Sequence, residues 1–199
     1  YYPDLLGHLA HVLTPMQAHC AMIKEEMPDA FTVFIGPCVS KKREADEASS
    51  VDCCLTFDEI SEWMMSAGVS TEPSASKDGE GERARFYPTA GGIIKSMNKT
   101  PGYHRVAIDG VSNCRAALEE IRGGKLSGVF IEMSACEGSC VAGPIIREHR
   151  QRRLSGALKV ACYAGYGDYE ITPPKDMSMP IPPAGLKRVM LGAEAVAEV

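Results

Sequence analysis

Hydrophobic positions along the chain repeat with two different periods. In residues 15–27 apolar side chains recur every three or four positions, which predicts a helix with one buried face. Residues 31–35 form a compact run of β-branched and aromatic side chains and predict a buried strand, and similar runs predict strands at 104–108 and 129–133. Strands that alternate with helices indicate an α/β fold, with a parallel β-sheet or sheets flanked by helices.

Helix-capping signals place two further helices. Thr56 and Glu59 have the spacing of a capping box, and Ser112 is a suitable cap for the second helix. The face expected to be buried in the first helix contains Ile60, Trp63, Met64 and Ala67. The face expected to be buried in the second contains Cys114, Ala117, Leu118 and Ile121.

Three further stretches complete the prediction: two without apolar periodicity and one at the end of the chain. Residues at about 70–85 are small, polar and glycine-rich, which is typical of a flexible loop. Residues 172–185 are rich in proline and predict an extended wrap, and residues 186–199 predict a final helix.

The composition narrows the function classes. With 199 residues, of which 45% are hydrophobic and 24% charged, the chain can bury a sizeable core as a soluble globular protein. A net charge of −5 argues against nucleic acid as a partner. No apolar run approaches the roughly 18 residues of a membrane span, and the first residues lack a secretion signal, so we expect a cytoplasmic protein.

The eight cysteines are the most informative feature of the composition. In a reducing cytoplasm cysteines fill the core, attack a substrate or bind metal, and seldom form disulfides. Cys20, Cys114 and Cys162 are expected to be core residues. Cys53 and Cys54 lie in a short predicted strand that favours packing, although adjacent cysteines can also be ligands.

Cys136 and Cys140 stand four positions apart, directly after the strand predicted at 129–133. Small residues around them leave room for a bulky group, and Pro144 can begin a helix whose N-terminus would favour an anion. A thiolate-ligated iron–sulfur cluster is such an anion. Zinc is an alternative, but no histidine has the spacing of a second ligand pair. The spacing alone leaves a metal site and a metal-free loop both open.

Cys38 also follows a predicted strand, and Lys41 and Lys42 come shortly after it. Lysines near a thiol lower its pKa and attract anionic ligands, whereas the alternative is a solvated basic turn. Because binding sites gather at the carboxyl ends of parallel strands, Cys38 and the loop from Cys136 to Cys140 are the candidate site.

Three motifs occur in order along the chain. They are Pro37-Cys38-x-x-Lys41-Lys42-x-Glu44, Thr89-Ala90-Gly91-Gly92 and Glu132-x-x-Ala135-Cys136-x-Gly138-x-Cys140-x-x-Gly143. Together they closely resemble the C-terminal domain of the [FeFe]-hydrogenase large subunit. The resemblance runs from residue 1 to about 145, and the last part of the chain is similar to the shorter, divergent branch of that family, to which a sensory role is ascribed.

The resemblance implies part of the two-lobed iron-only hydrogenase fold over residues 1–199, and an H-cluster in the parent protein. That cofactor is a [4Fe-4S] cluster joined through a cysteine sulfur to a diiron subcluster with CO and CN ligands. Cys38, Cys136 and Cys140 would be ligands of the [4Fe-4S] cluster, with Cys140 as the bridge. Of the two candidate catalytic residues, Lys41 would donate to a cyanide and Glu132 would anchor the loop. A ferredoxin-like electron-transfer domain or protein and hydrogenase maturation proteins would be the partners.

The chain also departs from the pattern of the catalytic branch. A Thr-Ser-Cys-Cys-Pro motif that carries the fourth cluster ligand would lie upstream of Tyr1, so we expect the 199 residues alone to be inactive and to hold metal poorly or not at all. Gly36 and Ser134 replace methionines, and Ala10 replaces a serine of the proton path. Reversible H2 oxidation, H2 sensing, a non-catalytic role in cluster assembly or partner binding, and a zinc-loaded or metal-free scaffold therefore remain as alternatives.

Overall fold

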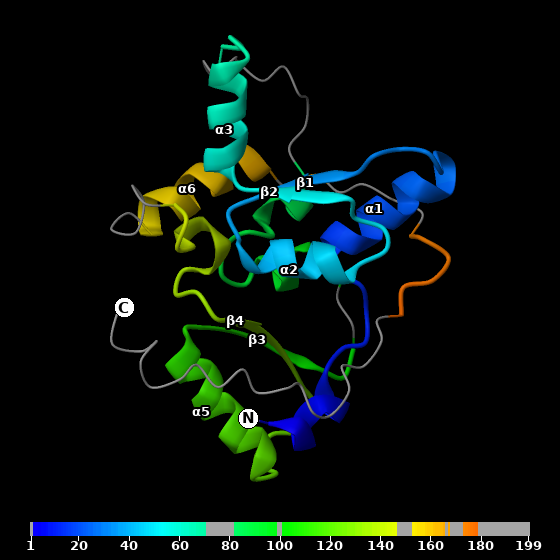
Figure 1. Ribbon diagram of the computed structural model, residues 1–199. Helices are drawn as coiled ribbons and strands as arrows, with labels where there is room; N and C mark the ends of the chain where they lie inside the picture. The colour runs from blue at the N-terminus through cyan, green and yellow to red at the C-terminus, as the bar shows by residue number, and fades with distance from the viewer. Residues whose placement is uncertain are drawn as a thin grey trace, which may run out of the picture.

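Two pairs of parallel strands organise the structure (Figure 1). In the first pair β1 (Val33–Ile35) lies beside β2 (Cys53–Leu55), and in the second β3 (His104–Asp109) lies beside β4 (Val129–Ser134). The computed structural model describes residues 2–70, 82–98, 101–146, 153–165, 167 and 173–178. The strands predicted from the apolar runs are present, and the α/β class with parallel pairing is confirmed. The prediction that the strand at 31–35 is buried is wrong, since Val33 and Ile35 are 43% and 44% exposed. An apolar run indicates a strand but does not show which elements cover it.

A helix connects the two strands within each pair, as parallel pairing requires. These connections are α2 (Ser40–Glu47) between β1 and β2, and α5 (Val111–Arg122) between β3 and β4. The other elements are η1 (Pro3–His8), α1 (Pro15–Glu26), α3 (Phe57–Ser66), η2 (Arg83–Phe86), α4 (Gly92–Ser96), η3 (Ser139–Ala142) and α6 (Arg153–Ala164). None of the helices in the described residues is long and apolar enough to cross a membrane.

The apolar core lies where α1 and α2 pack beside the β1–β2 pair (Figure 1). Its buried residues are Met16, Cys20, Ala45, Val51 and Cys54. The helix predicted at 15–27 is confirmed as α1, which begins with Pro15 after Thr14, whose side chain accepts a hydrogen bond from the Gln17 N–H. Proline suits this position because its missing N–H would have no helical partner there.

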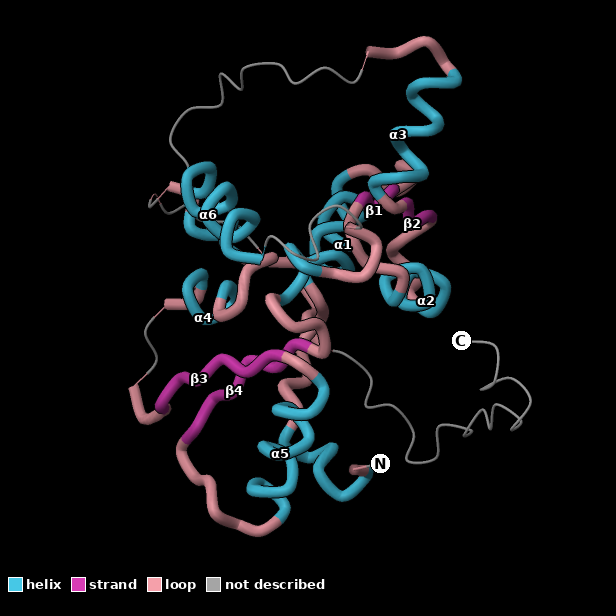
Figure 2. The backbone as a smooth tube through the Cα atoms, turned by 90° about the vertical axis from the view of Figure 1, so that its left-hand side faces the viewer, coloured by secondary structure: helices cyan, strands magenta, loops and turns pink. Residues whose placement is uncertain are grey.

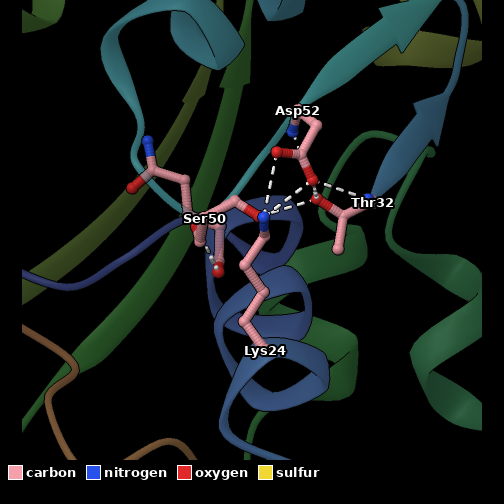
Figure 3. Close-up of polar contacts among 5 residues, drawn as sticks. Lys24, Thr32, Ser50 and Asp52 are labelled. Carbon is pink, nitrogen blue, oxygen red and sulfur yellow. Dashed lines mark hydrogen bonds and ion pairs between the residues drawn. The ribbon is translucent and has the colours of Figure 1, made fainter. Parts of the chain in front are cut away.

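The beginnings of β1 and β2 are joined by a carboxylate (Figure 3). Asp52 accepts hydrogen bonds from the Thr32 N–H at 2.7 Å and from the Lys24 ammonium at 2.9 Å. The Thr32 hydroxyl in turn donates to the Ser50 carbonyl at 2.8 Å. The Lys24 ammonium is the first cause of a lowered Asp52 pKa, which is about 2.

The predicted cysteine packing is correct for only part of the set. Cys20 is buried in the core, and burial raises the pKa of its thiol. Cys114 is half-buried, and Cys162 is exposed on α6, so its assignment to the core is wrong. Cys53 and Cys54 form the predicted short strand, and Cys54 is buried.

Helix α3 begins as the sequence predicts but does not pack as it predicts. Thr56 and Glu59 form the expected capping box. The helix projects away from the strand pairs (Figures 1 and 2), none of its residues is buried, and Trp63 is 64% exposed. The prediction that Trp63 lies on a buried face is wrong, because periodicity reveals an apolar face but not whether anything covers it.

Helix α5 also starts differently from the prediction. Its N-cap is Gly110, with a positive φ of 84°, and not Ser112. A Cβ at Gly110 would lie 2.9 Å from the Glu137 side chain, so glycine is required both by φ and by space. Of the predicted inner face only Ala117 is fully buried.

The stretches without regular periodicity are described only in part. Of the loop expected at about 70–85, residues 71–81 lie outside the described residues, and Arg83–Phe86 form η2. Of the proline-rich stretch, residues 173–178 are described, and the Leu13 N–H donates to the Met177 carbonyl at 2.9 Å. The helix predicted at 186–199 lies outside the described residues.

Candidate functional site

The first cysteine loop leaves β1 and enters α2 directly. Cys38 is the second residue before α2, and its carbonyl accepts a hydrogen bond from the Lys41 N–H at 3.3 Å. The Lys41 ammonium forms an ion pair with Glu44, whose other carboxylate oxygen accepts a hydrogen bond from the Thr14 hydroxyl. The cation predicted beside the cysteine is therefore held in place from two helices.

The second cysteine loop leaves β4 and turns sharply between its two cysteines. Gly138 has a φ of 82°, and Ser139 is a non-glycine residue with a φ of 60°. The Gly138 N–H donates to the Asp109 carboxylate at 2.7 Å, and the Ser139 N–H donates to the Cys136 carbonyl at 3.0 Å. Ser139 is buried with its hydroxyl 3.1 Å from that of Ser134. Side chains from both strands of the pair thus fix the turn.

The two cysteine loops meet at Gly143. A Cβ on this buried glycine would lie 3.1 Å from the Pro37 carbonyl oxygen and 3.2 Å from that of Cys140. Only a residue without a side chain fits easily in this space. The glycine therefore allows the chain beyond Cys140 to lie directly against the chain that precedes Cys38.

Burial and nearby charged groups shift the pKa of the Cys140 thiol. Burial raises the pKa of the Cys140 thiol, and the nearby charge of the Cys38 thiolate raises it further, as does that of Cys136. Lys41 acts in the opposite direction. Cys38, Cys136 and Lys41 therefore lie near enough to Cys140 for their charges to act on its thiol, although Cys38 and Cys140 are far apart in the sequence.

A third loop, residues 86–92 between η2 and α4, closes on the second cysteine loop. The Val141 N–H donates to the Pro88 carbonyl at 3.1 Å. The turn is tight, because a Cβ at Gly92 would lie 2.0 Å from the Phe86 carbonyl oxygen. Figure 2 shows α4 beside the β3–β4 pair.

Glu132 on β4 binds the helix that follows this third loop. It is 5% exposed, and its carboxylate accepts a hydrogen bond from the Ile94 N–H at 3.0 Å. Ile94 is in the first turn of α4, where backbone N–H groups lack helical partners. Among the described residues, the element that Glu132 anchors is α4.

Two groups at the site were not singled out from the sequence. Asp109 ends β3 and reaches the second cysteine loop, and Tyr87 lies in the third loop. Burial raises the pKa of the Tyr87 hydroxyl, and the charges of Cys140, Glu44 and Glu132 raise it further. Their sequence positions carry no sign of these neighbours, because every contact is long-range.

The helix predicted to begin at Pro144 is not formed where it was expected. Residues 144–145 make a turn, and the next described helix begins at Arg153. A helix N-terminus therefore does not contribute to anion binding at this position. A hydrogen bond from the Ser139 side chain and the positive charge of Lys41 both lower the pKa of the Cys140 thiol and so oppose the effect of the other thiolates.

The donor set fits a cluster better than a single ion. Within the described part of the chain, no three His, Cys, Asp or Glu side chains are close enough together to hold one metal ion. A cluster binds each thiolate through a different iron, and so accepts ligands that stand farther apart. Three half-buried thiols on two loops, one of them close enough to an ammonium for its charge to act on the thiol, fit the thiolate ligation of an iron–sulfur cluster.

These features define an α/β protein with a thiol-lined site at the ends of parallel strands. The family described as "Iron only hydrogenase large subunit, C-terminal domain" matches residues 1–104 and 98–144. Since these matches cover more than half of the chain, the protein belongs to this family.

Known relatives and solved structures are similar to the chain over most of its length. It is 23% identical to the periplasmic [Fe] hydrogenase large subunit of Nitratidesulfovibrio vulgaris and 25% identical to iron hydrogenase 1 of Clostridium pasteurianum, over 72% of this chain in each case. The matches span 47% and 34% of those relatives, so the chain is about half their length or less. The cytoplasmic location stays a prediction, because one relative is periplasmic.

The structural comparison supports the fold. One solved [FeFe]-hydrogenase structure has a TM-score of 0.57 and 17% identity to this chain, and the match covers 89% of this chain and 63% of the other. That structure concerns oxygen inactivation through modification of the 2Fe subcluster of the H cluster. An [FeFe]-hydrogenase of Chlamydomonas reinhardtii has a TM-score of 0.56 and 16% identity, covering 89% and 64%. The fold class inferred from the sequence is thereby confirmed.

Proposed function

We propose that this chain supplies cysteine ligands to the H-cluster of an [FeFe]-hydrogenase-like protein. One observation carries the proposal: the Cys38 loop and the loop from Cys136 to Cys140 come together, with Gly143 against the Pro37 carbonyl. Family membership and the identity of the relatives agree with it.

In this proposal the three cysteines hold a [4Fe-4S] cluster. By the resemblance to the family, Cys140 would also join the cluster to the diiron subcluster, and the charges of the other two proposed ligands both act on its thiol. When bound, such a cofactor supplies the redox and Lewis-acid chemistry that interconverts H2 with two protons and two electrons.

Lys41 is proposed to donate to a cyanide ligand of the diiron subcluster. An ammonium has three N–H donors, and the ion pair with Glu44 uses one of them. Its charge lowers the pKa of the Cys140 thiol, which supports a position near the proposed bridge. Glu132 is proposed to act indirectly, by holding α4 and the loop that closes on Val141.

The departures from the catalytic branch favour H2 sensing over fast turnover. Gly36 and Ser134 stand where that branch has methionines, and Ser134 instead lies within hydrogen-bond distance of Ser139 beside Cys140. Ala10 is exposed and carries no hydroxyl for a proton path. Electron transfer with a ferredoxin-like partner and delivery of the diiron unit by maturation proteins complete the proposal. Retention of Lys41 favours it over a role in cluster assembly, because a plain [4Fe-4S] cluster has no cyanide to bind.

Anaerobic reconstitution with iron and sulfide tests the cluster. Although the chain is expected to hold little metal when purified in air, under anaerobic reconstitution it should bind both in equal amounts and gain the broad visible absorption of an iron–sulfur cluster. Cys38→Ser, Cys136→Ser and Cys140→Ser should each lose most of this absorption, whereas the control Cys162→Ser, at an exposed thiol on α6, should keep it. Equal absorption in all four variants would overturn the proposal.

The diiron part needs a separate measurement. A synthetic diiron complex should be taken up by the reconstituted chain, and its cyanide infrared bands should move in Lys41→Gln more than its carbonyl bands. Lys125→Gln, at an exposed lysine in the segment between α5 and β4, is the control and should leave both sets unchanged. Identical infrared spectra for Lys41→Gln and the wild-type chain would contradict the role given to Lys41.

A further inference from the structure

The Glu44 carboxylate divides its two oxygens between two partners. One oxygen accepts a hydrogen bond from the Lys41 ammonium, and the other accepts one from the Thr14 hydroxyl. Lys41 and Glu44 lie three positions apart on α2, whereas Thr14 caps α1 and stands 30 positions from Glu44. Because the two partners come from different helices, they fix the orientation of the carboxylate and of the ammonium paired with it.

The start of α1 fixes the Thr14 hydroxyl in turn. Its oxygen accepts a hydrogen bond from the Gln17 N–H at 3.5 Å, and its hydrogen goes to Glu44. One residue earlier, the Leu13 N–H donates to the Met177 carbonyl at 2.9 Å. Since α1 also contributes to the apolar core, the hydroxyl is attached to the most firmly packed part of this half of the molecule.

The neighbouring lysine, Lys42, offers an internal comparison. Its ammonium forms an ion pair with one oxygen of Glu59, and the other oxygen accepts from the hydroxyl of Thr56 at 3.0 Å. Thr56 is likewise a helix N-cap. The Lys42 and Glu59 side chains are 38% and 42% exposed, against 23% for both members of the Lys41 pair. Water screens the Lys41 pair less, so its geometry depends more on the groups that hold it.

We propose that Thr14 is a positioning residue for the Lys41 ammonium. By holding one oxygen of Glu44, it limits that carboxylate to a single N–H of Lys41 and leaves the other two N–H groups for an outside acceptor. The inference rests on the proposed function, in which that acceptor is a cyanide ligand of the diiron subcluster. Without the hydroxyl, the carboxylate can turn to water or take a second N–H of the ammonium.

The variant Thr14→Val keeps the size of the side chain and removes the hydroxyl. In the reconstituted chain we expect it to bind the synthetic diiron complex about tenfold more weakly, because the ammonium spends less time in the binding position. Its cyanide infrared bands should shift in the same direction as in Lys41→Gln. Thr14→Ser keeps the hydroxyl and should restore both the affinity and the bands.

Thr56→Val is the matched control, because it removes the corresponding hydroxyl beside Lys42. Both valine variants lose a helix cap and should lower the thermal midpoint. Only Thr14→Val should change the binding of the diiron complex and its cyanide bands. Equal changes in the two valine variants would reduce the role of Thr14 to helix capping and overturn the inference.

Two further measurements cover the case in which Thr14→Val folds poorly or binds no cofactor. Thr14→Asp keeps an oxygen for the cap but has no hydrogen to donate to Glu44, so it should fold and show the same loss of binding. In the cofactor-free chain, the ¹⁵N signal of the Lys41 ammonium, assigned by its absence in Lys41→Gln, should shift in Thr14→Val and Thr14→Asp but stay in place in Thr14→Ser.

The outcomes separate this inference from the proposed function. If Lys41→Gln binds the diiron complex with unchanged infrared bands, the proposed role of Lys41 fails first. If Lys41→Gln changes the bands, and the Thr14 variants match the wild-type chain in affinity, cyanide bands and ammonium signal, only the role of Thr14 fails.

Discussion

The two strand pairs each contribute one cysteine loop, but they are stabilised in different ways. Around β1–β2 the buried residues are mainly apolar and form the cluster that contains Met16 and Cys54. Around β3–β4 and the loops that meet it, the buried residues are small or polar, namely Thr89, Ala117, Glu132 and Ser139. The first pair therefore has an apolar cluster beside it, whereas the second has buried polar groups that need their hydrogen-bond partners.

The difference also shows in how each loop is fixed. The Cys38 loop leads directly into α2. There the Lys41 ammonium forms an ion pair with Glu44, whose carboxylate accepts a hydrogen bond from the Thr14 hydroxyl. The loop from Cys136 to Cys140 is fixed through its own backbone, by Asp109 at Gly138. Mutations should therefore affect the two halves differently. The volume of buried side chains should matter most around β1–β2, and hydrogen-bond acceptors should matter most around β3–β4.

The largest effect is expected in the apolar half. Met16 is 4% exposed, and Met16→Ala should lower the free energy of unfolding by about 3 kcal/mol, because it removes buried apolar contacts and leaves a cavity. Urea denaturation followed by circular dichroism measures this change.

Trp63→Ala is the matched control for Met16→Ala, since it removes a larger apolar side chain that is 64% exposed. It should change the free energy of unfolding by no more than about 0.5 kcal/mol. A loss at Trp63 as large as that at Met16 would mean that α3 is covered in solution, and the contrast between core and projecting helix would be lost.

A smaller effect is expected in the polar half, at Glu132. Glu132→Ala should cost about 2 kcal/mol, because the Ile94 N–H loses a buried acceptor at 3.0 Å. Glu132→Gln should recover more than half of this loss, since the amide oxygen can still accept. Native-state hydrogen exchange should show faster exchange of the Ile94 amide in Glu132→Ala than in Glu132→Gln. If the two variants lost the same stability and exchanged alike, the carboxylate would not be anchoring α4.

Much of the fold could be predicted because its signals are local. The period of apolar residues in α1 and the capping box of α3 depend on neighbours three or four positions away. The exposure of Trp63 could not be predicted in this way, because it depends on which elements pack against α3. Ser112 fails as the cap of α5 for a related reason: Gly110 can adopt a positive φ one residue before the helix begins.

The residues of the candidate site also differ in whether the sequence carries a local signal for them. Cys38, Cys136 and Cys140 could be singled out as candidates because strand ends, cysteine spacing and the neighbouring lysine are visible in the sequence. Asp109 binds the Gly138 N–H of the second cysteine loop, and the charge of Cys140 raises the pKa of Tyr87, both across long sequence separations. Tertiary packing decides such contacts, and a single sequence without aligned homologues carries no signal for them.

The next effect concerns the turn of the second cysteine loop. Asp109→Ala removes the acceptor of the Gly138 N–H and should cost about 1 kcal/mol. The Gly138 amide should exchange faster, whereas the Ile94 amide should be unaffected. Asp29→Ala, at an exposed aspartate after α1, is the control and should change neither amide. Unchanged protection of Gly138 in Asp109→Ala would show that the turn is held by the rest of the loop.

The smallest effect is a pH dependence in the β1–β2 half. The pKa of Asp52 is lowered to about 2, first by its hydrogen bond from Lys24 and then by that from the Thr32 N–H, whereas an unfolded aspartate titrates near about 3.9. A carboxyl whose pKa is lower in the folded state stabilises the protein above the unfolded value, and this stabilisation is lost as the pH falls towards the folded value. Thermal unfolding midpoints should therefore fall between about pH 5 and pH 2, and less steeply in Asp52→Asn than in the unchanged chain. The dependence should not vanish, because the Lys42 ammonium also lowers the pKa of Glu59 to about 2. The control Asp29→Asn should show the same fall of the midpoint with pH as the wild-type chain. If Asp52→Asn also shows that same fall, the carboxylate between Lys24 and Thr32 does not join the two strands in solution.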